Sequence, residues 1–153
     1  MKSAKYKDSV ENLSKAIDIA VNVINQTPPD KFREQDIKQF ISVYLEYQNK
    51  ILNPQPQFAN MTSLKYSIND IFTYFQEGAG QTVDMFWEKI KEIGLPYKRE
   101  NKLAKILKRK RIKDDIEFDF VIDVLVPYRQ EGLINEEEWV LLNKWIGDFE
   151  SKK

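Results

Sequence analysis

The chain has 153 residues, and its 24 Lys/Arg balance its 24 Asp/Glu, so the formal net charge is zero. Hydrophobic residues make up 42% of the chain, which excludes a disordered polyelectrolyte and allows a packed core without disulfides. The absence of cysteine and histidine removes thiol chemistry, the commonest general base and the commonest metal ligand. At this length we expect one domain, residues 1–153.

The apolar runs are short. None approaches the roughly 18 residues that a membrane span requires, and neither end has the pattern of a signal peptide. We therefore expect a cytoplasmic protein with no membrane partner. The sequence gives no indication of oligomeric state.

Apolar residues recur at steps of three and four along most of the chain, which is typical of amphipathic helices. Proline and glycine stand between these segments, at Pro28, Pro54, Gly78, Gly94 and Gly132, where each can end a helix. The predicted helices cover about residues 8–26, 30–52, 62–77, 82–93, 99–111, 114–131 and 135–149. The pattern predicts an all-α fold, a bundle of six or seven helices.

Two of the predicted helices begin with a recognisable cap. Asp114 with Glu117 three residues later, and Asn135 with Glu138, are typical capping pairs. Asp30 is expected to cap the second helix. In the helix from Asp114, apolar side chains cover about two-thirds of the circumference, so we expect it at the centre of the bundle. Val121 and Leu125 are its predicted core residues.

The charges are strongly segregated. Residues 98–113 hold nine Lys/Arg and one acid, whereas eleven acids and four Lys/Arg follow from Asp114 onward. If residues 99–111 form a helix, Leu103, Ile106 and Leu107 make a narrow apolar stripe. The opposite side then carries five cations, which are the candidate binding residues: Lys98, Lys102, Lys105, Lys108 and Arg109.

Three interpretations of this basic face stay open. It can bind nucleic acid through phosphate contacts, although no base-reading pattern or helix-turn-helix signal accompanies it. It can dock on an acidic protein surface, which we favour as the partner. It can also neutralise the acidic C-terminal third of the chain, and this structural role is compatible with protein docking.

Other patterns in the sequence have features of functional sites. Gly78–Thr82 has the glycines of a phosphate-binding loop but lacks its lysine, so a turn between helices is the better interpretation. Asp115, Asp119 and Asp123 lie four apart, yet one helical stripe rarely surrounds a cation. No two carboxylates can be placed across a cleft. We therefore expect no enzyme, no cofactor and no bound metal.

A C-terminal block resembles one shared by small uncharacterised bacterial proteins. It is carried by the motifs Phe86-Trp87, Leu95-Pro96-Tyr97-Lys98-Arg99-Glu100-Asn101-Lys102-Leu103, Phe120-Val121-Ile122-Asp123 and Glu131-Gly132-Leu133-Ile134. The resemblance covers about the last 70 residues and implies a bacterial source but no activity. By analogy of class, small helical proteins of this kind look like immunity or antitoxin proteins that cover a partner. A protein-binding module is therefore the favoured function, and a nucleic-acid-binding protein is the alternative.

Overall fold

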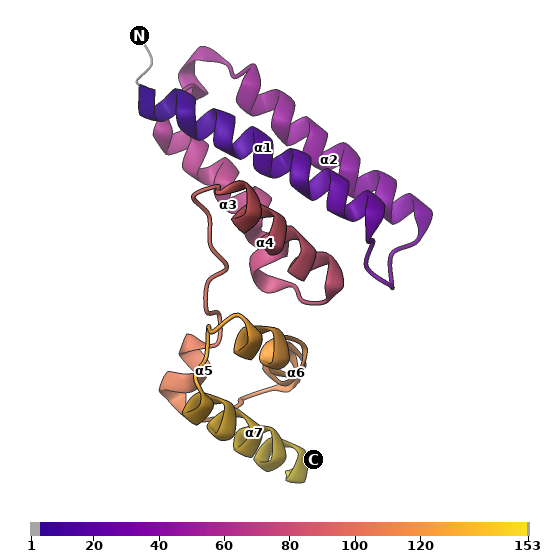
Figure 1. Ribbon diagram of the computed structural model, residues 1–153, viewed down its shortest axis with the longest axis vertical. Helices are drawn as coiled ribbons and strands as arrows, with labels where there is room; N and C mark the ends of the chain where they lie inside the picture. Colours follow the sequence, from indigo (N-terminus) through magenta and orange to yellow (C-terminus); the bar gives the residue numbers. More distant parts are fainter. Residues whose placement is uncertain (1–3, 153) are drawn as a thin grey trace. The chain divides into compact units, whose positions relative to one another are not determined.

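A computed structural model describes residues 4–152 of the chain, and it confirms the all-α prediction. The described residues form seven α-helices and one 3-10 turn, with no strand among them (Figure 1). The elements are α1 (Ala4–Gln26), α2 (Glu34–Leu52), η1 (Pro56–Phe58), α3 (Met61–Glu77), α4 (Gln81–Ile93), α5 (Ala104–Arg109), α6 (Asp115–Gln130) and α7 (Glu136–Ser151).

The helices group into two compact units, each with its own hydrophobic core. Unit 1 contains the chain up to Phe75 together with Gln81–Lys98, and unit 2 contains Gln76–Gly80 and the chain from Arg99 onward. Two separate clusters of buried apolar side chains follow this division. The expectation of one domain over residues 1–153 stays a prediction.

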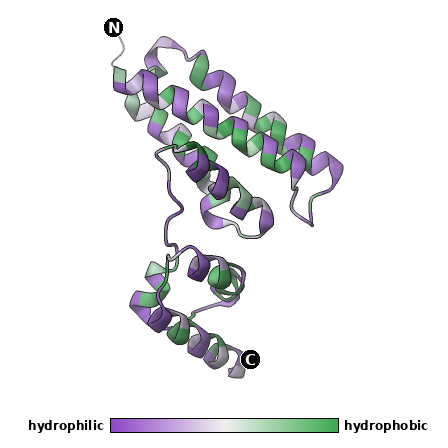
Figure 2. Ribbon diagram, viewed as in Figure 1, coloured by the Kyte–Doolittle hydropathy of each residue, from purple (hydrophilic) through white to green (hydrophobic). Residues whose placement is uncertain are grey.

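Unit 1 is built on α1, which packs against both α2 and α4 (Figure 1). Hydrophilic and hydrophobic stretches alternate along α1 and α2, as expected of helices that bury one side (Figure 2). Aromatic rings fill much of the core. Phe75 and Phe86 stack with their centroids 3.8 Å apart. The Tyr44 hydroxyl donates to the carbonyl of Ile71 at 2.6 Å, so the buried phenol is satisfied.

Unit 2 consists of α5, α6, α7, the segments that connect them, and Gln76–Gly80, which is the end of α3 and the turn after it. Helices α6 and α7 pack against each other and bury Val121, Leu125, Tyr128 and Leu142, among others. Both predicted N-cap residues are confirmed, but of the two pairs only Asn135–Glu138 forms the full reciprocal box, because the Glu117 carboxylate bonds to Arg109 and to Lys113 N. The Asp114 carboxylate accepts from Glu117 N at 2.9 Å, and the Asn135 side chain accepts from Glu138 N at 2.8 Å.

The sixth helix differs from its prediction. Val121 and Leu125 are buried as expected, but Ile116, Ile122 and Val126 are 82%, 47% and 50% exposed. The expectation that this helix is buried on most sides is therefore wrong. One face of α6 packs against the rest of unit 2, and the opposite face is exposed. Apolar residues around a helix do not by themselves show how many neighbours cover it.

Two further local expectations can be compared with the structure. Asp30 does not cap the second helix, because α2 begins later and its N-cap residue is Arg33. The expected glycine stops are confirmed at Gly94 and Gly132, which have positive φ angles of 81° and 75°. At Gly132 the next amide, Leu133 N, donates back to Tyr128 O at 2.9 Å and closes the end of α6.

Candidate functional site

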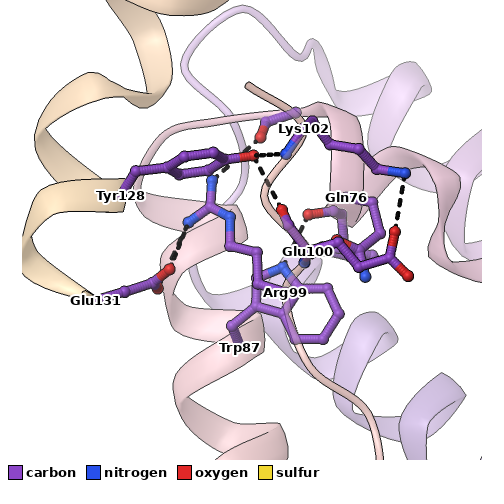
Figure 3. A network of polar contacts seen from close by, with 9 residues as sticks. Gln76, Trp87, Arg99, Glu100, Lys102, Tyr128 and Glu131 are labelled. Atoms are coloured by element: carbon purple, nitrogen blue, oxygen red, sulfur yellow. Dashed lines mark hydrogen bonds and ion pairs between the residues drawn. The ribbon is translucent and has the colours of Figure 1, made fainter. Parts of the chain in front are cut away.

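The segment Arg99–Leu103 crosses unit 2 without forming a helix, and a buried arginine holds its start (Figure 3). The Arg99 side chain is almost fully buried. Its Nη1 lies 3.4 Å from the carboxylate of Glu131, and its Nη2 donates to the carbonyl of Gly78 at 3.3 Å. The guanidinium also lies over the Tyr128 ring, 5.1 Å from the centroid. These partners offset part of the cost of burying the charge.

Tyr128 and Asn101 hold the rest of this segment. The Tyr128 hydroxyl donates to Glu100 O at 3.2 Å and accepts from Lys102 N at 3.3 Å (Figure 3). Burial raises the pKa of Tyr128, so the hydroxyl stays protonated and able to donate. Asn101 donates to Leu133 O at 3.0 Å and accepts from Leu103 N at 2.9 Å. The network therefore fixes a non-helical segment where the sequence predicts a helix.

This arrangement corrects the predicted helix over residues 99–111. Only Ala104–Arg109 is helical, so the five candidate binding residues do not share one helix face. Lys98 belongs to unit 1, whereas the other four belong to unit 2. Lys102 precedes α5 and pairs with Glu100 at 3.1 Å. Lys105, Lys108 and Arg109 are the candidates that α5 carries.

The chain leaves α5 through a left-handed residue. Lys110 has φ 68° and ψ 31°, and its amide donates to Ile106 O at 2.8 Å. An L-residue with a side chain rarely takes this conformation, which glycine usually adopts at the end of a helix. The turn directs Ile112 into the core of unit 2, where it is buried. The prediction that the helix ends before Ile112 is confirmed.

Arg109 has a partner within unit 2. Its Nη1 and Nη2 donate to the two carboxylate oxygens of Glu117 at 2.7 and 3.1 Å, which is a bidentate pair. Glu117 also accepts from Lys113 N at 3.0 Å. The hydrogen bond from Arg109 is the main reason that the pKa of Glu117 lies below its usual value. The pair joins the end of α5 to the start of α6.

Five exposed cations remain in this part of the chain. Four of them, Lys105, Lys108, Lys110 and Arg111, define the basic segment, and the fifth, Lys113, follows the buried Ile112. Within the described part of the chain, none of these four side chains forms an ion pair. The cluster lies within seven consecutive residues. The basic face predicted from the sequence includes Lys105 and Lys108 but not Lys110 and Arg111. In a helix over residues 99–111, the side chains of Lys110 and Arg111 would lie away from that face.

The open face of α6 carries acids and apolar side chains together. Asp119, Ile122, Asp123 and Val126 follow the spacing of one helix face, and all four are exposed. The carboxylates of Asp119 and Asp123 form no ion pair within residues 4–152. Over the same residues, no group of three or more acidic side chains is placed to hold a metal ion. We call these four residues the α6 open face.

Unit 1 contains a shallow hollow of about 320 Å³ between the start of α1 and the end of α2. Its lining is mainly apolar and includes Tyr6, Val10, Ile51 and Ala59, with Lys7 as the charged member. No carboxylate lines it, so it lacks the paired acids that general acid–base chemistry uses.

The turn at Gly78–Gly80 has a structural contact. The Gly78 carbonyl accepts from Arg99, as described above, and Gly80 has a positive φ of 109°. The residues form the turn after α3, which agrees with the predicted interpretation. Of the three tryptophans, Trp87 and Trp145 are buried, and Trp139 is half-buried with the guanidinium of Arg129 4.2 Å from its ring centroid.

Comparison with known proteins gives no match: no family model, no curated protein and no solved structure is similar to this chain. None of these comparisons bears on the resemblance of the C-terminal block. Among residues 4–152, no helix combines the length and the apolar character needed to cross a membrane.

Proposed function

We propose that the chain is a non-enzymatic protein-binding module whose basic segment in unit 2 docks on an acidic protein surface. The observation that supports this most is the side-chain environment of the segment. Lys105, Lys108, Lys110 and Arg111 are exposed and have no ion-pair partner in the described chain. Cations left unpaired in this way can steer a partner of opposite charge.

The surroundings of the basic segment favour a protein over nucleic acid. Ile116 is 82% exposed only five residues after Arg111, and Ile122 and Val126 are half-exposed further along α6. Exposed apolar side chains beside charges suit the centre and rim of a protein interface. Asp119 and Asp123 on the same helix would repel a phosphate backbone. Nucleic-acid binding through the same segment is the alternative.

One test of the proposal is affinity capture with matched charge reversals. Three tagged samples are incubated with cell extract, with and without nuclease. They are the wild-type chain, the variant Lys105→Glu/Lys108→Glu and the control Lys65→Glu/Lys91→Glu. The control changes the net charge by the same amount, and its two lysines are exposed on α3 and α4 with no ion pair in the described chain. Captured protein and nucleic acid are identified and quantified.

The proposal predicts an acidic protein that is captured by the wild type and the control, is lost with Lys105→Glu/Lys108→Glu, and is unaffected by nuclease. The melting temperature of the double variant should stay within a few degrees of the wild type, because exposed unpaired lysines contribute little to stability. Capture that depends on RNA or DNA would support the alternative. Unfolding of the double variant would assign the segment a structural role instead.

A further inference from the structure

Unit 2 carries two complementary surfaces, and neither is neutralised within the described chain. The basic segment presents four exposed cations, and the α6 open face presents Asp119 and Asp123 around Ile122 and Val126. The segment leads directly into α6, so both surfaces belong to one continuous stretch of chain. The basic segment has four positive charges and the α6 open face has two negative charges, and none of them forms an ion pair within the described residues.

We propose that the partner of the basic segment is a second copy of this chain, bound through the α6 open face. This inference rests on the proposed function, since it names the acidic protein that the segment recognises. An acidic and partly apolar surface is what the segment requires, and the α6 open face supplies both features. Ile122 and Val126, 47% and 50% exposed, would give the contact its apolar centre.

A two-fold arrangement allows both copies to make the contact at once. In an isologous interface, the basic segment of each copy meets the α6 open face of the other copy. Each charge match is therefore formed twice. The Lys102 amide lies beside Tyr128 and Arg109 lies beside Glu117, so the basic segment runs alongside α6. The α6 open face extends about 10 Å along the same helix, from Asp119 to Val126. A two-fold axis beside the α6 open face would place each basic segment over the acids of the other copy.

The net charge of the chain removes the usual obstacle to self-association. With 24 basic and 24 acidic residues, two copies have no overall repulsion. The contact is small and its charges are exposed, so we expect a weak dimer that dissociates as salt screens the pairs. The separate positions of the positive and negative charges, rather than the total charge, determine how the two copies are oriented in the dimer.

The test is sedimentation velocity of the purified full chain, from about 10 μM to about 1 mM, the range in which weak interfaces become populated. The wild type and the control Lys65→Glu/Lys91→Glu should shift from monomer toward dimer as concentration rises. Lys105→Glu/Lys108→Glu and Asp119→Lys/Asp123→Lys should each raise the dimer Kd by at least about tenfold, because each places like charges in contact.

The decisive sample is an equimolar mixture of these two reversed variants. In a mixed dimer, the introduced glutamates face the introduced lysines, and the native acids of one variant face the native lysines of the other. Dimer should therefore return in the mixture. Circular dichroism checks that each variant is folded, and Asp119→Asn/Asp123→Asn, which should weaken the dimer less, replaces the lysine variant if that fails to fold.

Two outcomes would overturn the inference: a wild type that stays monomeric throughout this range, or a mixture that associates no more than either variant alone. These outcomes are separate from failure of the proposed function. If the chain is monomeric and still captures a different acidic protein through Lys105 and Lys108, the proposed function stands and the self-association is wrong. If nothing acidic is captured and no dimer forms, both are wrong.

Discussion

Removing the hydroxyl of Tyr128 should destabilise the protein while leaving its core packing intact. The ring is fully buried, and its hydroxyl joins Glu100 O and Lys102 N, two backbone groups of the segment before α5. Tyr128→Phe keeps the ring under the Arg99 guanidinium and deletes only these two hydrogen bonds. Each has a net value of about 0.5–1.5 kcal/mol, so the loss in unfolding free energy should be about 1–3 kcal/mol.

The loss is measured by equilibrium unfolding in denaturant, with one m-value, the dependence of the unfolding free energy on denaturant, shared by variant and wild type. Tyr66→Phe is the matched control. Tyr66 is 72% exposed, so the same deletion there should change stability by less than about 0.5 kcal/mol. Amide exchange gives a local readout, since the Lys102 N–H should exchange faster in Tyr128→Phe than in the wild type. A loss below about 0.5 kcal/mol with unchanged exchange at Lys102 would refute this role for the hydroxyl.

Three further substitutions test other parts of unit 2. Leu125→Ala should lower the free energy of unfolding by about 2–5 kcal/mol, measured with denaturant. Ile122→Ala, at a half-exposed position on the same helix, should lower it by less than about 1 kcal/mol. Equal losses would contradict the one-sided burial of α6. Lys110→Gly should raise stability by up to about 1 kcal/mol by relieving the left-handed backbone, and no gain would argue against that conformation. Because Arg109 holds the pKa of Glu117 below 4.5, the pair stabilises the fold above about pH 4.5, and this contribution is lost as the pH falls through the lowered pKa. Glu117→Gln should therefore flatten the acid side of the stability–pH profile, and an unchanged profile would show that the pair is not formed.

Helix positions followed from the sequence wherever the local signals were strong. The Asn135–Glu138 box and the glycines at positions 94 and 132 predicted where α7 begins and where α4 and α6 end. These signals are local, because a cap or a left-handed glycine depends on hydrogen bonds within a few residues. The apolar spacing of Val121 and Leu125 likewise identified the buried side of α6.

The predicted basic helix was wrong because its N-terminal part is fixed by distant residues. Arg99 is held by Glu131 and Gly78, which lie 32 and 21 residues away in the sequence. A charged residue in a helical pattern gives no sign that such partners will bury it. One local signal was present: Asn101 caps the following amide of Leu103, and asparagine commonly forms such turns before a helix.

The most direct test of the proposed protein-binding function is the affinity of the purified chain for mixed-sequence duplex DNA, measured as a function of salt. A protein-binding module with acids beside its cations should bind such DNA more weakly than about 0.1 mM at physiological salt. If the basic segment instead neutralises four phosphates, the affinity should be in the micromolar range. The slope of log affinity against log salt would then be about −3.6 and become much shallower in Lys105→Glu/Lys108→Glu. That second result would contradict the proposed function and establish the nucleic-acid alternative.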